Sequence, residues 1–144
     1  MRLDKFTTKF QQALGDAQSI ALGKDHPFIE PQHLMLSLLQ QEDGSTVSLL
    51  QRAGVNVNPL REALVKSLGR MPKIEGGGGE INISRDLNNL LNLTDKEAQK
   101  RGDQFIASEM FLLALLEDKG ETGLLLKQHG VNRSALERAM NSVR

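Results

Sequence analysis

FIEPQHLMLSLL at residues 28–39 and FIASEMFLLALL at residues 105–116 are the two segments that decide the fold, and they lie 77 positions apart. Both begin with Phe-Ile, and both run into leucines at matching positions. A second matched pair follows, LLQRAGVN at residues 49–56 and LLKQHGVN at residues 125–132, at a shift of 76. Two such matches in the same order indicate that the chain is an internal duplication.

The duplication aligns residues 7–43 with residues 84–120, and the slip of one residue falls in the polar stretch that ends at Gly44. Almost every residue shared by the halves is apolar or glycine, so the halves share a core pattern. Leu14 matches Leu91, and both are expected at equivalent buried positions. At this length we predict one domain over residues 1–144. Its predicted parts are repeat one (1–69), a Gly-rich linker (70–83) and repeat two (84–144).

Helical periodicity dominates both halves. Apolar residues recur at steps of three and four over residues 3–22, and an equivalent helix is predicted from about residue 84 to residue 100. Pro31 suits the first turn of the second helix, and Gly54 and Gly130 suit the left-handed position that ends each third helix. No stretch alternates with a period of two, which argues against a sheet. The expected fold is all-α, a duplicated four-helix repeat with about eight helices and pseudo-twofold symmetry.

The run Gly76–Gly79 could suggest a loop that binds phosphate. That pattern requires a Gly-Lys-Ser/Thr sequence opening a helix after a strand. No lysine follows the glycines here, and Glu75 and Glu80 flank them with charges that would repel phosphate. A flexible connector between the halves is the better interpretation.

Composition excludes several classes of function. Eighteen basic and eighteen acidic residues cancel, so the charge gives no reason to expect nucleic acid or an anionic membrane as partner. The chain has no Trp or Tyr for stacking on bases, and no Cys for thiol catalysis or thiolate metal sites. No apolar run approaches the length of a membrane span or a signal peptide. A cytoplasmic protein is expected.

Each candidate chemical site has a simpler explanation. Glu30 and His33 lie one helical turn apart and could hold a metal, but the second half places Met110 opposite His33, which favours a buried helix position. The carboxylates of Asp103 and Glu109 could act as an acid and a base, but most such pairs are solvated or cap helices. We therefore predict no catalytic residue, no metal and no cofactor in this domain. A small hydrolase is a further alternative. It requires the carboxylates of Asp103 and Glu109 to converge in a buried cleft.

Two leucines of the second half have no large apolar counterpart in the first. Leu90 and Leu93 match Ala13 and Asp16, and both drift off the inward stripe of their predicted helix. They could pack against the other half or the linker. They could also form an exposed apolar strip that takes up apolar segments of partners. The sequence leaves both interpretations open.

Three segments resemble the amino-terminal domain of the protein disaggregases in the Clp family of AAA+ chaperones: MRLDKFT at residues 1–7, FIEPQHL at 28–34 and KRGDQFI at 100–106. The resemblance extends over the whole chain, including the duplication. It implies a fold of two pseudo-symmetric four-helix repeats. It also implies a mobile domain above a hexameric, ATP-driven ring, which engages aggregated or unfolded polypeptides before they are threaded.

The resemblance also suggests site residues. In the family, a Thr in the first helix and an Asp and a Glu at the second inter-helix turn are associated with substrate engagement. These match Thr7, Asp103 and Glu109, and the repeat mates of the two carboxylates are His26 and Gln32. Both carboxylates are therefore confined to one half, as in a one-sided surface site. The predicted substrate-binding residues are Thr7, Leu90, Leu93, Asp103 and Glu109.

The resemblance implies a non-catalytic recognition domain that binds unfolded or aggregated polypeptides through an exposed apolar groove. ATP and Mg would be bound by modules that this sequence does not contain, since it has no phosphate-loop motif. Further expected contacts are those with the ring of its own full-length hexamer, and the isolated domain is expected to be monomeric. The alternative is an adaptor-docking domain of a Clp protease unfoldase, whose surface would bind one folded partner.

Overall fold

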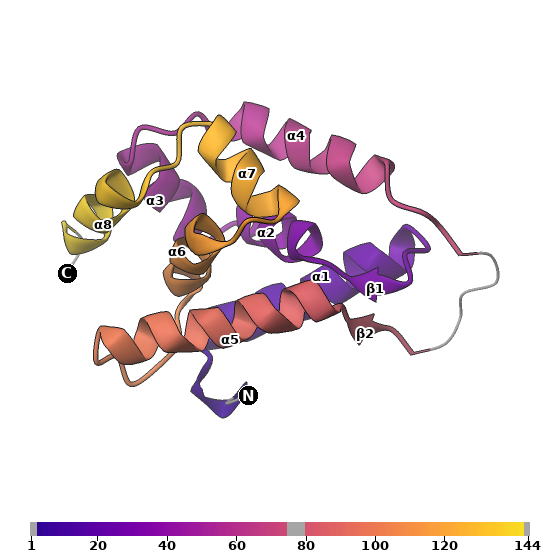
Figure 1. Cartoon of the computed structure of the whole chain (residues 1–144), viewed down its shortest axis with the longest axis horizontal. Coiled ribbons are helices and arrows are strands. Elements are labelled where there is room, and N and C mark those ends of the chain that lie inside the picture. Colours follow the sequence, from indigo (N-terminus) through magenta and orange to yellow (C-terminus); the bar gives the residue numbers. More distant parts are fainter. Residues whose placement is uncertain (1–2, 75–79, 143–144) are drawn as a thin grey trace.

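The computed structural model describes residues 3–74 and 80–142, and these ranges contain eight α-helices (Figure 1). The helices are α1 (Thr8–Gly23), α2 (Pro31–Gln40), α3 (Thr46–Arg52), α4 (Val57–Gly69), α5 (Arg85–Lys100), α6 (Ser108–Glu117), α7 (Glu121–Gln128) and α8 (Arg133–Asn141). A short 3₁₀ helix, η1 (Leu3–Lys5), precedes α1. The predicted all-α, duplicated four-helix fold is confirmed. The run Gly76–Gly79, predicted to be a flexible connector, lies outside the described residues.

The first helix of each half begins with the same cap. The side chain of Thr7 accepts a hydrogen bond from the backbone N–H of Phe10, and the side chain of Ser84 accepts one from that of Leu87. Thr7 and Ser84 are 77 positions apart, so the duplication extends to single hydrogen bonds. Each cap satisfies one of the backbone donors that a helix leaves unpaired at its start.

The third helix of each half also ends in the same way. Gly54 and Gly130 both have a φ of 87°, a conformation that favours glycine. The N–H of the following valine then bonds back into the helix, from Val55 to Leu50 (2.9 Å) and from Val131 to Leu126 (3.0 Å). These are the predicted helix-ending motifs.

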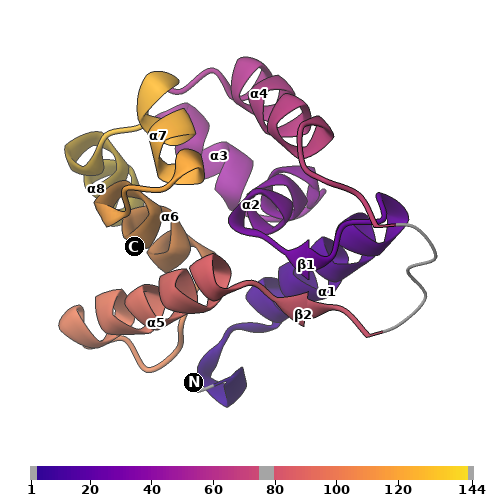
Figure 2. The same ribbon diagram turned by 45° about the vertical axis from the view of Figure 1, so that its right-hand side comes forward.

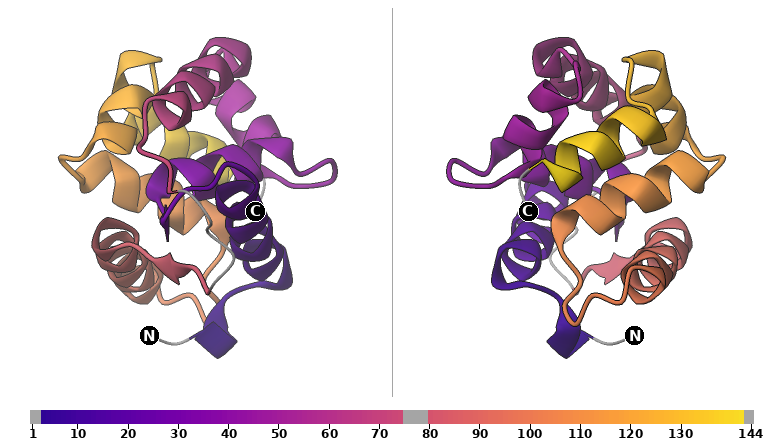
Figure 3. Two further views of the ribbon diagram at one scale, coloured as in Figure 1. Left: turned by 90° about the vertical axis from the view of Figure 1, so that its right-hand side faces the viewer. Right: turned by 90° about the vertical axis from the view of Figure 1, so that its left-hand side faces the viewer.

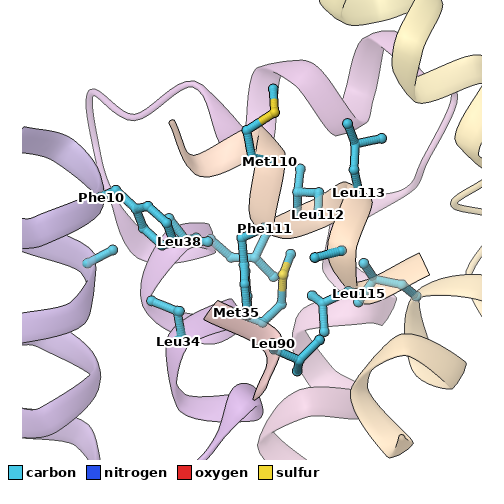
Figure 4. Close-up of a cluster of buried hydrophobic side chains, with 14 of the residues drawn as sticks. Phe10, Leu34, Met35, Leu38, Leu90, Met110, Phe111, Leu112, Leu113 and Leu115 are labelled. Atoms are coloured by element: carbon cyan, nitrogen blue, oxygen red, sulfur yellow. The ribbon is translucent and has the colours of Figure 1, made fainter. Parts of the chain in front are cut away.

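The centre of the molecule is formed by α2 and α6, in which almost every side chain is buried. Figure 4 shows Met35 of α2 beside Phe111 of α6, with Leu90 of α5 close below them. The ring of Phe111 lies 6.1 Å from that of Phe10, so α1 joins the same cluster. Each fully buried leucine or phenylalanine contributes about 1.5–3 kcal/mol, which makes these two helices the main source of stability.

The two halves exchange backbone hydrogen bonds in a reciprocal manner. The N–H of Thr7 donates to the carbonyl of Ile106, and the N–H of Ser84 donates to the carbonyl of Ile29, both at 3.0 Å. Next to these bonds, Phe6 forms a parallel bridge with Ile106. In each case the residue that starts a first helix is bonded to the loop before the second helix of the other half.

The same reciprocity continues in the packing of the outer helices. Helix α3 of the first half packs against α8 of the second, and α7 of the second half packs against α4 of the first. Since α3 and α7 are repeat mates, as are α4 and α8, the contacts obey the pseudo-twofold symmetry. The halves are therefore interlocked, and they share one core.

A short sheet was not expected from the sequence. Two-residue strands, β1 (Phe28–Ile29) and β2 (Asn82–Ile83), pair in parallel, with Ile29 opposite Ile83. Strands of this length cannot show an alternating pattern, and their pairing depends on the packing of the two halves. In the described ranges this is the only sheet.

The equivalence of Leu14 and Leu91 holds only in part. Leu91 is fully buried, whereas Leu14 is half-buried and packs against the edge of the core. The inward positions of α1 are Phe10, Ala13, Ala17 and Ala21, and they leave Leu14 at the margin of the buried face. The expectation that Leu14 is a core residue is therefore wrong.

This difference predicts unequal costs of truncation. Leu91→Ala should lower the free energy of unfolding by about 2–5 kcal/mol because it leaves a cavity. Leu14→Ala should cost about 1 kcal/mol because its site is open to solvent on one side. Urea unfolding of both variants measures the difference, and equal losses would contradict the placement of Leu14 at the edge of the core.

Candidate functional site

An apolar hollow of about 510 Å³ lies between α1 and the two short strands. Its apolar lining comes from Leu14 of α1, Ile29 of β1, and Ile81 and Ile83 at β2, and its polar lining from Gln11, Gln18 and Asn82. Figure 2 shows β1 and β2 beside α1. None of the lining residues carries a charge, so the hollow offers apolar area and neutral hydrogen-bonding groups.

A second, smaller hollow of about 150 Å³ continues from the first, since both are lined by Ile81. Its other lining residues are the apolar Leu22, Pro27 and Ile74 together with Asp25, His26 and Glu80. Leu22 and Ile74 are 43% and 45% exposed, which is unusual for large aliphatic side chains. The N–H of Ile74 donates to the carbonyl of Asp25 (2.9 Å), which holds this segment beside the end of α1.

We call the combined surface the α1 groove. Its apolar members are Leu14, Leu22, Ile29, Ile74, Ile81 and Ile83. On an α-helix at 100° per residue, the α1 positions 7, 11, 14, 18 and 22 fall within about 100° of one another. This face reads Thr, Gln, Leu, Gln, Leu and carries no charge over its whole length.

Thr7, Asp103 and Glu109 are brought to one corner of the molecule. Thr7 is half-buried at the start of α1, and its N–H is bonded to the carbonyl of Ile106. Ile106 lies in the loop that begins near Asp103 and leads to Glu109 in the first turn of α6. Both carboxylate residues are partly exposed, which does not fit a catalytic pair in a buried cleft. The arrangement gives no support to a small hydrolase.

Leu90 is not at the surface. Its side chain is 1% exposed and belongs to the core, where Figure 4 places it near Met35. The expectation of an exposed strip was wrong here because α5 packs against α2 of the other half as well as α6 of its own. Two packing partners widen the buried face of α5, so an angle of 60° from the inward stripe still points into the core.

Leu93 is half-buried and lies away from the α1 groove. It lines a hollow of about 330 Å³ together with Lys96, Glu97, Lys100, Ala114, Glu117 and Arg133. Charged side chains dominate this lining, in contrast to the neutral lining beside α1. Leu93 thus lies at a charged hollow, whereas Leu90, one helical turn before it on α5, is buried in the core.

Arg133 organises the hollow beside Leu93. Its guanidinium binds Glu97 through two hydrogen bonds (3.0 and 3.1 Å), and it also contacts Glu117 and Glu137 at 3.0 Å. The Glu97 side chain is only 5% exposed. The hydrogen bond from Arg133 lowers the pKa of the Glu97 carboxyl, although burial acts in the opposite direction. This network fastens α8 to α5 and α6, which is a structural role.

The buried histidines form a pair. His26 Nδ1 and His33 Nε2 lie 2.8 Å apart, and the N–H of Glu30 donates to His33 Nδ1 at 2.8 Å. Burial, followed by the neighbouring His26, lowers the pKa of His33 to about 4. Burial also lowers the pKa of His26. The Glu30–His33 spacing considered for a metal is thus used to cap α2.

Two further kinds of site are absent from residues 3–74 and 80–142. No group of three or more His, Cys, Asp or Glu side chains there could hold a metal ion. None of the helices in those ranges is both long enough and apolar enough to cross a bilayer.

The α1 groove was missed by the sequence analysis, which placed the apolar site on α5. A signal was present in the segment assigned as linker. Ile74, Ile81 and Ile83 are large β-branched residues on either side of a glycine run, where a solvated connector would carry polar residues.

Comparisons with known proteins agree with this geometry. The family model described as "Clp repeat (R) N-terminal domain" matches residues 5–129. The chaperone protein ClpB of Pseudomonas putida is 49% identical over all 144 residues, and the chain covers 17% of that protein's length.

Among solved structures, the Hsp104 N-terminal domain from Candida albicans superimposes with a TM-score of 0.83 at 21% identity. That match covers 97% of this chain and 91% of the other. A ClpV N-domain in complex with a VipB peptide has a TM-score of 0.78 at 20% identity, over 95% of this chain and 85% of that one.

The Arg133 network yields a stability prediction. Arg133→Gln should lower the free energy of unfolding by about 1–3 kcal/mol because the buried Glu97 carboxylate loses its partner. Since the pKa of Glu97 is lowered, this contribution is present above its ordinary pKa of 4.5 and fades as the pH falls below that value.

The matched control is Arg70→Gln, which breaks an ion pair with Glu121 whose side chains are 64% and 52% exposed. This change should cost less than about 1 kcal/mol. Thermal unfolding at pH 7 compares the two variants. A loss at Arg70 as large as that at Arg133 would refute the structural role of the Arg133 network.

Proposed function

Since the chain belongs to the Clp repeat N-terminal domain family, we propose that it is a non-catalytic recognition domain that binds unfolded or aggregated polypeptides along the α1 groove. The observation that carries the proposal is the uncharged face of α1, which is bordered by Ile81 and by Ile83 of β2. Apolar burial depends on area and not on a particular sequence. A groove of this kind suits clients that share only exposed apolar side chains.

The dimensions of the groove set the length of the client segment. From Thr7 to Leu22 the helix advances about 22 Å at 1.5 Å per residue. An extended chain covers that distance with about seven residues. Gln11, Gln18 and Asn82 are spaced along the same path and can donate to or accept from client backbone amides. A short extended segment, bound without sequence preference, fits these features.

We also propose that Thr7, Asp103 and Glu109 contact the client where it leaves the groove. Thr7 lies about two helical turns before Leu14 on the same face of α1, and the loop from Asp103 to Glu109 is bonded to it through Ile106. Carboxylates at this end can accept hydrogen bonds from client backbone N–H groups. The role of Leu93 in binding stays a prediction, and Leu93→Ser tests it. Leu90 is omitted because it is buried.

The relatives that this chain matches are much longer proteins. The P. putida ClpB relative is about six times as long as the matched segment, since the chain covers 17% of its length. In our proposal ATP and Mg are bound by other modules of such a protein, and this domain delivers client to their ring. The ClpV N-domain solved with a VipB peptide supports a role for this fold in binding polypeptide segments. An adaptor-docking surface would be polar and shaped for one folded partner, whereas the larger hollow of the α1 groove is lined only by apolar and uncharged polar residues.

The test of the groove uses exposed apolar residues inside and outside it. Ile83→Ser and Leu22→Ser should each weaken binding of a permanently unfolded model protein about threefold to tenfold. Their effect on the free energy of unfolding should be less than about 0.5 kcal/mol because both side chains are exposed. Binding is measured by fluorescence anisotropy of the labelled unfolded protein.

The control is Leu124→Ser, which removes a side chain of similar exposure (53%) on α7, away from the groove. It should leave binding unchanged. Binding that is equally weakened by all three changes, or by none of them, would rule out the α1 groove as the client site.

A further inference from the structure

The His26–His33 pair lies at the wall of the α1 groove, where His26 lines the smaller hollow. His26 is in the loop between α1 and β1, and His33 is in the first turn of α2. Two backbone hydrogen bonds that build the groove flank the pair. One runs from Ile74 N–H to the carbonyl of Asp25 (2.9 Å), and the other from Ser84 N–H to the carbonyl of Ile29 (3.0 Å).

The hydrogen bonds define where the protons of the neutral pair lie. His33 Nδ1 accepts the N–H of Glu30, so the proton of this ring is on Nε2 and is donated to His26 Nδ1. The proton of His26 is then on Nε2. That atom is buried and meets no acceptor in hydrogen-bond geometry among the described residues. The carbonyl of Leu68 is close enough to favour a protonated ring, but it does not complete a bond.

An extra proton on either ring breaks one of these bonds. On His26 it must occupy Nδ1, which faces the N–H of His33. On His33 it must occupy Nδ1, which faces the N–H of Glu30. Both rings are almost completely buried, at 3% and 0% exposure, so water cannot replace the lost partner in the closed structure.

The charges around the pair act in both directions. Lys24, at the end of α1, and Lys73, before the glycine run, oppose a positive charge on His26, and Asp25 favours one. His26 also lines a hollow of about 260 Å³, whose acidic lining residues are Glu30 before α2, Asp86 of α5, Asp118 after α6 and Glu121 of α7. Glu121 is paired with Arg70. Glu80 lines the smaller hollow of the groove together with His26.

We propose that the His26–His33 pair is an acid-sensitive latch: protonation of the pair releases β1 from the start of α2 and thereby opens the wall of the α1 groove. The consequence for client binding rests on the function proposed above. The release of β1 does not depend on that function, because it follows from the hydrogen bonds of the histidine pair.

The direction of the pH effect follows from the neutral state of the closed pair. Both histidines have a lowered pKa in the folded protein, and His33 reaches about 4. Their stabilising effect is therefore complete above the unfolded value of 6.5 and is lost as the pH falls from 6.5 towards 4. The equilibrium constant for local opening should rise at least about tenfold between pH 7 and pH 5.

The duplication supplies an internal control. The second half has Asp103 and Met110 at the positions of His26 and His33, so the equivalent corner has no histidine pair. Amide hydrogen exchange, corrected for the intrinsic rate, compares two equivalent bonds in one molecule. The N–H of Ser84 should lose protection about tenfold between pH 7 and pH 5, while the N–H of Thr7 should keep its protection.

Variants test whether the histidines cause the difference. In the double variant His26→Gln, His33→Met, where Met is the residue of the second half, protection of Ser84 should no longer depend on pH. Equal loss of protection at Ser84 and Thr7 in the native chain would overturn the latch, and so would a pH dependence that persists in the double variant. If the double variant does not fold, the comparison within the native chain decides alone.

The coupling to client is measured separately. A neutral apolar peptide without ionisable side chains should bind more weakly at pH 5 than at pH 7, and the double variant should show no such change. Binding that is equal at the two pH values while Ser84 opens would overturn the control of the groove by the latch. Failure of the peptide to bind at pH 7 would instead reject the proposed function, while the exchange result would still establish or refute the release of the wall.

Discussion

The reciprocal exchange of backbone hydrogen bonds between the halves is the constraint on which the rest of the structure depends. Thr7 and Ser84, the residues that cap α1 and α5, each donate to the loop that precedes the second helix of the other half. The cap residue of one half is thereby fixed to the central helix of the other, and the four helices that form the core are set in register. The same exchange draws the segment after the glycine run against β1, which creates the wall of the α1 groove.

The groove exists because the inward faces of the first helices in the two halves carry side chains of different size. In α1 the inward positions carry three alanines, so this helix packs closely and leaves Leu14 at the edge. In α5 the equivalent face carries Leu87, Leu90 and Leu91, all of which are buried. In the second half the larger apolar side chains are therefore buried in the core. In the first half apolar surface is left beside α1, at the groove. Figure 3 (left) shows β2 between α5 and α1.

The features that could be predicted depend on residues close together in the sequence, and they occur in both halves. The helix ends at Gly54 and Gly130 and the all-α class follow from residue types at fixed spacing. The predicted start of the first helix at residue 3 was wrong, because Thr7 caps a helix that begins at Thr8. The burial of Leu90 could not be derived from one helix, because it depends on contact with a helix of the other half. The β1–β2 pairing and the groove were missed for a similar reason. Their residues come from segments about 50 positions apart in the sequence, and only the interlocked packing brings them together.

The crosswise packing of α3 with α8 and of α7 with α4 bears on the origin of the chain. In each half the third helix packs against the fourth helix of the other half, which is the reciprocal pattern of contacts in a twofold homodimer. Because both halves belong to one chain, their sequences need not be identical. The histidines on one side, and the carboxylates Asp103 and Glu109 on the other, are differences that a true homodimer could not have accumulated.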